Sequence, residues 1–317
     1  MRMMSKTIRI GTRDSELALW QAKTVQAQLE NLGYDTTLVP VKSTGDLVLD
    51  KPLYELGITG IFTKTLDVAM LNGTVDIAVH SMKDVPTALP IGIVQAAVLE
   101  RANTADILVH KDTIDYIKNC TIATGSLRRQ AQWLHKYPHH TTTDIRGNVN
   151  TRLQKLNDND WAGTIFAKAG LERLGFYNSN AITSPSFGGV GEELDWMVPA
   201  PAQGAMLVVA LEDDDYCKTA CAKINDTSTA LCTHIEREFL RVLEGGCTAP
   251  IGALATIEND TLHFTGVLFS LDGKTKIEVT QSISISHSQG FGTDCALEVL
   301  DNGGRELMKE IKAQIKK

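Results

Sequence analysis

Short apolar segments alternate with stretches of helical periodicity over the first two thirds of the chain. Residues 7–10 predict a strand and residues 11–15 the turn after it, with Ser15 as the N-cap of a helix that continues to about Asn31. This alternation of strands and helices is typical of an α/β architecture with a mainly parallel or mixed sheet. Further strands are predicted at 36–41, 76–80, 91–98, 121–124, 163–167 and 205–211, and further helices at 62–71, 126–136, 148–157 and 168–175.

Two stretches interrupt this pattern. Residues 42–61 lack a sustained period and predict a loop. Residues 178–204 are rich in Ser, Gly and Pro, and we expect them to connect two bodies of the protein.

The last hundred or so residues follow a different pattern. A long helix is predicted from about Thr227 to Leu243, and three segments of β character follow it, separated by the turn pairs Asn259–Asp260 and Asp272–Gly273. A terminal helix at 294–315 is interrupted by Gly303–Gly304. We therefore expect a separate C-terminal α+β domain with a small antiparallel sheet.

Length and hydropathy narrow the class of protein. The chain has 317 residues, enough for two or three domains. Mean hydropathy is -0.08, and the uncharged apolar run Trp196–Leu211 is short for a membrane span and contains two prolines. After Arg2 the chain meets charge again at Lys6 and Arg9, with no apolar region before them. We therefore expect no membrane span, no secretory signal and a cytoplasmic location.

Charge and cysteine content narrow the class of ligand. A net charge of -7 and a pI near 5.6 argue against a nucleic-acid partner, yet five of the twelve arginines lie between residues 128 and 173. This concentration predicts a local site for a small anion. The six cysteines are too sparse for a disulfide framework, and Cys217 and Cys221 lack a second pair at zinc spacing, so no metal site is expected.

The segment HSMKDVP at 80–86 follows a buried strand, so its side chains emerge at the strand's carboxyl end, where open α/β sheets bind ligands. Lys83 and Asp84 offer one cation and one carboxylate there. The alternative is a solvated turn with a local ion pair.

Arginines stand at two further junctions between a strand and a helix. TGSLRRQ at 124–130 places Arg128 and Arg129 at a helix start, and DIRGNVNTR at 144–152 places Arg146 and Arg152 around the next one. If these junctions converge, they would bind a ligand with several carboxylates, which arginine forks suit well. The alternative is a polar helix face with two exposed arginines.

EGGCTAPIG at 244–252 places Cys247 in a loop bracketed by glycines, between a long helix and a strand. A reactive or modified thiol and a buried small apolar residue are equally compatible with this context. No Cys–His hydrolase signature is present, and neither a GxxxxGK[ST] loop nor a GxGxxG turn supports a nucleotide site.

Eight motifs in order along residues 7–252 resemble the porphobilinogen deaminase family. HSMKDVP and EGGCTAPIG are the most specific of them, and the chain beyond residue 252 fits in length and pattern. The other six are GTRDSELALWQA, FTKTLD, GSLRRQ, RGNVNTRLQKL, AGLERLG and PAQGAM.

The resemblance implies three domains: two α/β lobes similar to those of periplasmic binding proteins, with the active site between them, and a third domain with the cofactor cysteine. The corresponding ranges are 1–100 with 200–222, then 101–199, then 223–317. Family members join four porphobilinogen molecules head to tail, release ammonia at each step and free the linear tetrapyrrole hydroxymethylbilane. A dipyrromethane cofactor, thioether-linked to the cysteine that matches Cys247, anchors the growing chain.

The resemblance also implies roles for individual residues. Asp84 matches the catalytic carboxylate that stabilises cationic intermediates and manages the proton. Each pyrrole unit carries an acetate and a propionate. The remaining residues match the positions that bind these carboxylates in the family. Those implied for the cofactor are Lys83, Thr124, Ser126, Arg128 and Arg129, and those implied for the substrate are Arg13, Ser15, Arg146, Arg152 and Arg173.

This chain departs from the family pattern in places. Glu55 and Thr59 stand where many members have lysines, which puts a role of the 42–61 loop in charge neutralisation in doubt. Gly125 replaces a common serine, Ala202 replaces a glycine, and Lys168 could supply a compensating cation. We expect a monomer that binds porphobilinogen but neither nucleic acid nor membrane. The alternative is a noncatalytic, two-lobed carboxylate-binding protein.

Overall fold

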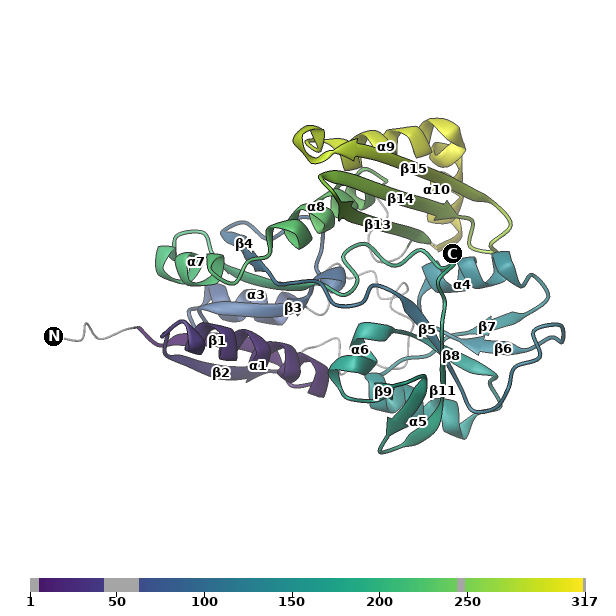
Figure 1. The fold of residues 1–317 in the computed structure, drawn as a ribbon, viewed down its shortest axis with the longest axis horizontal. Helices are drawn as coiled ribbons and strands as arrows, with labels where there is room; N and C mark the ends of the chain where they lie inside the picture. Colours follow the sequence, from purple (N-terminus) through teal and green to yellow (C-terminus); the bar gives the residue numbers. More distant parts are fainter. Residues whose placement is uncertain (1–5, 43–62, 244–248, 316–317) are drawn as a thin grey trace. The chain divides into compact units, whose positions relative to one another are not determined.

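The computed structural model describes residues 6–42, 63–243 and 249–315 (Figure 1). The chain divides into two compact units. The first comprises Met1–Val48, Ile58–Ala102 and Gly204–Leu231, and the second comprises Leu49–Gly57, Asn103–Gln203 and Cys232–Lys317. None of the described helices is both long and apolar enough to cross a membrane.

Unit 1 is built on a five-stranded mixed sheet with helices on both faces. The strand order is β2-β1-β3-β12-β4, in which β12 runs antiparallel to β3 and β4 while β1 is parallel to β2 and β3. Ile8 and Ile10 face one core with α1 and α7, whereas Gly11 faces Leu66 of α3. The strands are β1 (Ile8–Arg13), β2 (Thr36–Val41), β3 (Ile77–Ser81), β4 (Ile93–Val98) and β12 (Met206–Leu211), and the helices are α1 (Glu16–Asn31), α3 (Lys64–Leu71) and α7 (Asp215–Ala222).

Unit 2 contains a seven-stranded mixed sheet in the order β7-β6-β8-β5-β11-β10-β9. Strand β6 is parallel to both β7 and β8, and the pairings from β8 through β5 to β9 are antiparallel. Trp133 of α4 packs on one face of the sheet, and Leu153 of α5 and Leu171 of α6 pack on the other. The strands are β5 (Asp106–His110), β6 (Thr121–Ala123), β7 (Thr141–Thr143), β8 (Gly163–Ala167), β9 (Tyr177–Asn178), β10 (Ala181–Ser184) and β11 (Phe187–Glu193), and the helices are α4 (Leu127–Lys136), α5 (Val149–Asp158) and α6 (Lys168–Arg173).

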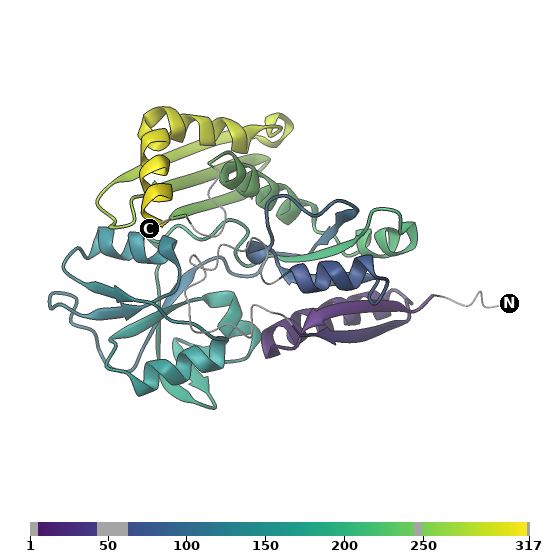
Figure 2. The ribbon, with the colours of Figure 1, turned by 180° about the vertical axis from the view of Figure 1, so that it is seen from behind.

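The C-terminal part of unit 2 is the expected antiparallel sheet, β13-β14-β15. On one face, Phe264 contacts Phe239 of α8 and Phe291 of α9, and Figure 2 shows α9 and α10 lying along this sheet. On the other face, Val267 and Phe269 pack against Ala131 of α4. The elements are α8 (Thr227–Val242), β13 (Ile251–Glu258), β14 (Thr261–Phe269), β15 (Lys276–Ser284), α9 (Phe291–Val299) and α10 (Arg305–Ile315).

Turn chemistry explains the boundaries of these last elements. Asn259 and Asp260 both have positive φ, 47° and 61°, which a two-residue hairpin turn of this kind requires. Gly273 supplies the positive φ of the next hairpin, and Gly303, with φ 99°, breaks the terminal helix as predicted.

The predicted α/β class and the C-terminal antiparallel sheet are confirmed, two expectations about elements are wrong, and some elements had no counterpart in the prediction. Strand β1 continues to Arg13, so residues 11–13 are not in a turn. The stretch 178–204 is not only a connection, because it contains β10 and β11. Strands β5 and β7 and helix α7 were not expected. The loop at 42–61 lies almost entirely outside the described residues, and the proposed domain boundaries remain a prediction.

Candidate functional site

In unit 1, the predicted residues gather at one edge of the sheet. Strands β1 and β3 are parallel neighbours with Gly11 opposite Ala78, so both chains leave the sheet at the same edge. Arg13 ends β1, and Ser15 follows as the N-cap of α1, where its hydroxyl accepts a hydrogen bond from Ala18 N at 3.4 Å. Lys83 comes two residues after the end of β3.

Lys83 and Asp84 lie in a single helical turn, Met82–Asp84, held by buried residues on both sides. Met82 N donates to Ala205 O at 3.0 Å, and Val85 N donates to Met82 O at 3.1 Å. Because Met82 and Val85 are buried while the two residues between them are half-buried, the turn presents Lys83 and Asp84 away from the core.

His80 stands at the carboxyl end of β3 and is 6% exposed. Its Nε2 has no hydrogen-bond partner among the described residues. Burial, and secondarily the charge of Arg13, lowers the pKa of His80 to about 4. The imidazole is therefore neutral at pH 7.

In unit 2, the two arginine-bearing junctions at 124–130 and 144–152 lie at one sheet edge, together with the junction after β8, whereas the junction at 80–86 belongs to unit 1. Strands β7, β6 and β8 are parallel neighbours, so the segments that follow them leave the sheet on the same side. Thr124 follows β6 and donates its N–H to Thr143 O of β7 at 2.8 Å. The residues at these junctions are Thr124, Ser126, Arg128 and Arg129 after β6, Arg146 and Arg152 after β7, and Lys168 and Arg173 after β8.

The turn between β6 and α4 is tight. Ser126 is the N-cap of α4, and its side chain makes no capping hydrogen bond, while its N–H donates to Thr124 Oγ1 at 3.3 Å. A Cβ added at Gly125 would lie 2.7 Å from the carbonyl oxygen of Ile145. The close approach of the segment before Arg146 therefore leaves no room for a side chain at position 125.

Arg128 and Arg129 are not on an exposed polar face, so that alternative is wrong. Their side chains are 4% and 7% exposed, and both bind the fully buried carboxylate of Asp106. Arg128 Nη1 donates to Asp106 Oδ2 at 2.7 Å, and Arg129 donates to Oδ1 from Nη2 at 2.7 Å and from Nε at 3.0 Å. Burial alone would raise the pKa of Asp106, but the two guanidiniums outweigh it and hold that pKa well below its ordinary range.

This cluster has one positive charge in excess and a buried donor atom without a partner. Two guanidiniums share a single carboxylate, and the buried Nε of Arg128 has no hydrogen-bond partner among the described residues. An uncompensated buried charge is costly, so a ligand carboxylate would stabilise the arrangement. Sequence reasoning missed Asp106, which lies 22 residues before Arg128 in a strand that was not expected.

The other cations at this sheet edge, Arg152, Arg173 and Lys168, do not share the Asp106 carboxylate. The guanidinium of Arg152 stacks over the ring of Phe166 at 4.7 Å from the centroid, and burial lowers the pKa of Arg173 to about 10. Lys168 binds Glu193 and lies 3.8 Å from Glu172, so neighbouring carboxylates offset its charge.

Cys247 lies in residues 244–248, outside the described part of the chain. Ala202, another departure, has a positive φ of 62°, a conformation that glycine adopts at lower cost. Its N–H donates to Glu236 Oε2 at 2.6 Å.

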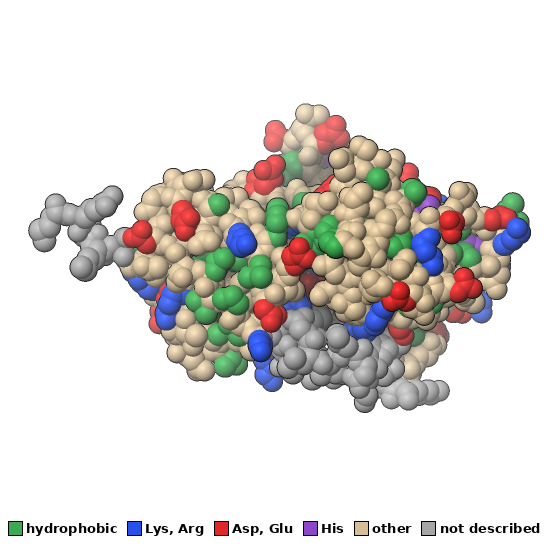
Figure 3. Space-filling view, turned by 90° about the horizontal axis from the view of Figure 1, so that it is seen from below, with side chains coloured by type: hydrophobic (Ala, Val, Ile, Leu, Met, Phe, Trp, Pro, Cys, Tyr) green, Lys and Arg blue, Asp and Glu red, His purple; other side chains and the backbone are tan. Residues whose placement is uncertain are grey.

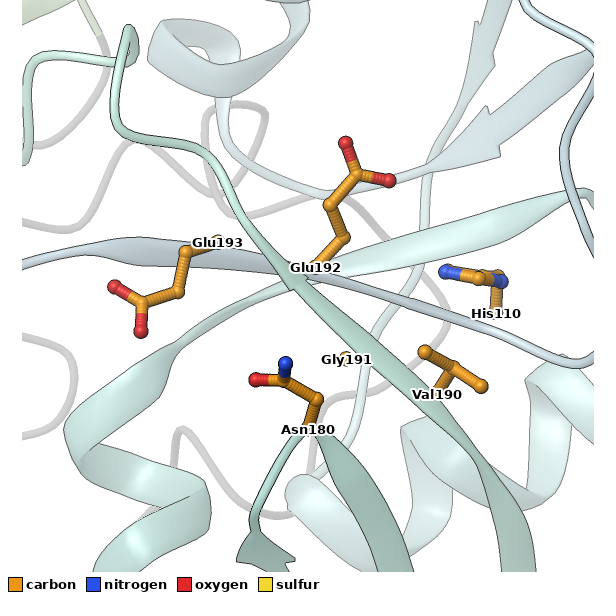
Figure 4. A pocket seen from close by; sticks show the side chains of 6 residues that line it. All are labelled: His110, Asn180, Val190, Gly191, Glu192 and Glu193. Atoms are coloured by element: carbon orange, nitrogen blue, oxygen red, sulfur yellow. The ribbon is translucent and has the colours of Figure 1, made fainter.

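A separate hollow of about 500 Å³ lies over β5 and β11 (Figure 4). It is lined by His110, Asn180, Val190, Gly191, Glu192 and Glu193, none of which was predicted as a site residue. Glu192 and Glu193 point to opposite sides of β11, where they bind Tyr116 and Lys168 respectively. The carboxylates of this hollow therefore already have partners.

Charges of both signs are mixed on one face of the molecule. On the face in Figure 3, Lys and Arg side chains are scattered among Asp and Glu rather than gathered in one patch. Within residues 6–42, 63–243 and 249–315, no group of three or more His, Cys, Asp or Glu side chains could hold a metal ion.

The fold and the two sheet edges define an α/β protein whose buried arginines suit a ligand with carboxylates. Two family models match the chain: "Porphobilinogen deaminase, dipyromethane cofactor binding domain" over residues 8–219 and "Porphobilinogen deaminase, C-terminal domain" over residues 230–301. The chain belongs to the porphobilinogen deaminase family. It is thus a transferase of tetrapyrrole biosynthesis that uses porphobilinogen and a dipyrromethane cofactor.

Curated relatives match over nearly their whole length. The porphobilinogen deaminase of Geotalea uraniireducens is 40% identical over 313 residues, which are 98% of this chain and 96% of that one. The enzyme of Chlorobium phaeovibrioides is 38% identical over 318 residues, 98% of this chain and 99% of that one. Among solved structures, the methionine binding protein MetQ aligns with 69% of this chain and 89% of its own, with a TM-score of 0.42 and 13% identity. The family assignment rests on the sequence matches.

Proposed function

We propose that this chain condenses four porphobilinogen molecules head to tail, releases ammonia at each step and yields hydroxymethylbilane. The observation that supports this most directly is the buried pair Arg128 and Arg129 on the single carboxylate of Asp106, within a chain of this family. The alternative of a noncatalytic carboxylate-binding protein is not favoured, because both family models match enzyme domains.

The dipyrromethane cofactor fits the donors that the structure shows. Each of its pyrroles carries an acetate and a propionate, and the excess charge and unpartnered Nε at Arg128 suit such a carboxylate. We propose that Cys247 holds the cofactor as a thioether and that Lys83, Thr124, Ser126, Arg128 and Arg129 bind it. When bound, the cofactor supplies a covalently held pyrrole terminus to which new units are joined.

We propose that Arg13, Ser15, Arg146, Arg152 and Arg173 bind the carboxylates of the substrate and the growing chain. Holding both partners in one site makes each coupling effectively intramolecular.

Asp84 is the proposed catalytic carboxylate. Loss of ammonia from porphobilinogen leaves a cationic azafulvene, and a carboxylate that accepts pyrrole N–H bonds stabilises that cation. The same carboxylate can hold or release the proton that the coupling transfers. The buried anchors Met82 and Val85 fix the position of Asp84 for this role.

Intact mass tests the proposal. The purified chain should weigh more than its sequence by one two-pyrrole unit, and Cys247→Ser should lack that increment. A wild-type chain that forms hydroxymethylbilane at its unmodified mass would contradict the assignment of Cys247.

We also propose a monomeric enzyme in the cytoplasm. Light scattering after size-exclusion chromatography tests the first point, and fractionation of the source cells tests the second.

A further inference from the structure

Asp106 is the centre of a buried network that the sequence did not reveal. It begins β5, is 0% exposed, and lies opposite Ala167 in the middle of the seven-stranded sheet. Its two carboxylate oxygens accept four hydrogen bonds, three from the guanidiniums of Arg128 and Arg129 and one from Gln203 Nε2 at 3.0 Å.

The convergence of the two arginines depends on this carboxylate. Consecutive residues on an α-helix point about 100° apart, so Arg128 and Arg129 have no intrinsic reason to meet. Two buried guanidiniums also repel one another, and the charge of Arg129 contributes, after burial, to lowering the pKa of Arg128. Asp106 offsets that repulsion, and the carbonyls of Val198 and Ile165 fix the outer ends of the two side chains.

We propose that Asp106 is a positioning residue, which orients Arg128 and Arg129 so that their excess positive charge meets a ligand carboxylate. The inference rests on the proposed function, because it concerns the same site. In this arrangement the Asp106 carboxylate neutralises one of the two guanidiniums, so one positive charge remains. The Nε of Arg128 also has no hydrogen-bond partner among the described residues.

The network also includes Gln203, the last residue of unit 2 before the chain returns to unit 1. Gln203 is fully buried, and its Nε2 donates to Thr104 O at 2.8 Å as well as to Asp106. The chain enters unit 2 at Asn103 and leaves it after Gln203. The side-chain amide of Gln203 therefore links the segment that ends at Gln203 with the segment at Thr104. Its hydrogen bond to Asp106 Oδ1 helps to orient the carboxylate toward the arginines.

The test compares Asp106→Asn with a matched control, Asp76→Asn. Asp76 is also buried and also binds an arginine, Arg9, but it lies in unit 1 and outside the proposed site. For wild type, both variants and Asp106→Glu, two quantities are measured on the full chain: the fraction with the two-pyrrole mass and the unfolding temperature.

Asp106→Asn should reduce the cofactor-bearing fraction about tenfold or more, since a hydrogen bond to a charged group is lost and an amide N–H faces the guanidiniums. Asp106→Glu keeps the charge and should regain part of that fraction. Asp76→Asn should lower the unfolding temperature but keep the cofactor. If Asp106→Asn does not fold, Asp106→Glu is compared with Asp76→Asn. A smaller cofactor-bearing fraction in Asp106→Glu supports the positioning role, and an equal fraction contradicts it.

A cofactor fraction that follows the unfolding temperature in the same way for all variants would overturn the positioning role. Full cofactor occupancy in a folded Asp106→Asn chain would also overturn it. Failure of the proposed function looks different, because the wild-type chain would then lack both the added mass and hydroxymethylbilane formation.

Discussion

The imidazole of His80 stays neutral because its surroundings favour the uncharged form. Burial, followed by the charge of Arg13, lowers its pKa to about 4 from the ordinary value of 6.5. Between these two values the unfolded chain binds a proton that the folded chain does not. The contribution of His80 to stability is therefore complete above pH 6.5 and is lost as the pH falls toward 4.

From this difference in pKa, the free energy of unfolding should fall by about 2 kcal/mol between pH 7 and pH 5. Urea unfolding of wild type and His80→Gln at the two pH values measures this contribution, which the variant should lack. His263→Gln, at an exposed position on β14, is the control and should keep the wild-type difference. An equal pH dependence in wild type and His80→Gln would contradict the assignment.

Among the elements, the junction between β6 and α4 is constrained by its neighbour. The carbonyl oxygen of Ile145 leaves no room for a Cβ at Gly125, which would approach it to 2.7 Å. A serine at this position should therefore strain the backbone on which Arg128 and Arg146 depend.

We expect Gly125→Ser to reduce the free energy of unfolding by about 1–3 kcal/mol, the usual cost of overpacking. Gly188→Ser on β11 is the matched control, because a Cβ there would meet nothing closer than 4.0 Å. Chemical denaturation of both variants measures the difference. A Gly125→Ser chain as stable as the Gly188→Ser chain would show that the Ile145 segment moves aside at little cost.

The sequence predicted most elements because their periodicity is strong, and it failed where packing overrides local pattern. Strand β11 has glycines at 188, 189 and 191, which resembled a linker. The structure shows why two of them are needed: a Cβ at Gly189 would lie 2.5 Å from His110 O, and one at Gly191 would lie 2.7 Å from Ile107.

The candidate site was predictable to a similar extent. Its junctions follow recognisable strands, so HSMKDVP and TGSLRRQ could be placed at sheet edges from the sequence. The pairing of Arg128 with Asp106 could not, because no periodicity connects residues 22 positions apart in different elements. The short buried strand that begins at Asp106 also lacks polar alternation.

For the whole molecule, the two units contribute different chemistry. Unit 1 supplies the proposed catalytic carboxylate, Asp84, and unit 2 supplies the buried arginines that are proposed to bind the cofactor. Loss of the Asp84 carboxylate should therefore affect turnover, and loss of a buried arginine at 128 or 129 should affect cofactor assembly.

Asp84→Asn should keep the two-pyrrole mass and lose about 100-fold or more in turnover, as the loss of a general acid–base group does. Arg128→Gln should instead lose much of the added mass, because Asp106 then has one cation and the site has no excess charge. Intact mass and the rate of hydroxymethylbilane formation, measured on the same preparations, separate the two effects. Near-normal turnover in Asp84→Asn would refute its role.

The order of strands also has a consequence during synthesis on the ribosome. The seven-stranded sheet of unit 2 is encoded between Asp106 and Glu193, whereas the sheet of unit 1 needs β12, residues Met206–Leu211, between β3 and β4. At ordinary rates of translation, the interval from Val98 to Met206 takes roughly 5–20 s. Throughout it, β3 and β4 have unpaired edges that could associate with other nascent chains. The sheet whose translation begins first is thus completed only after the seven-stranded sheet.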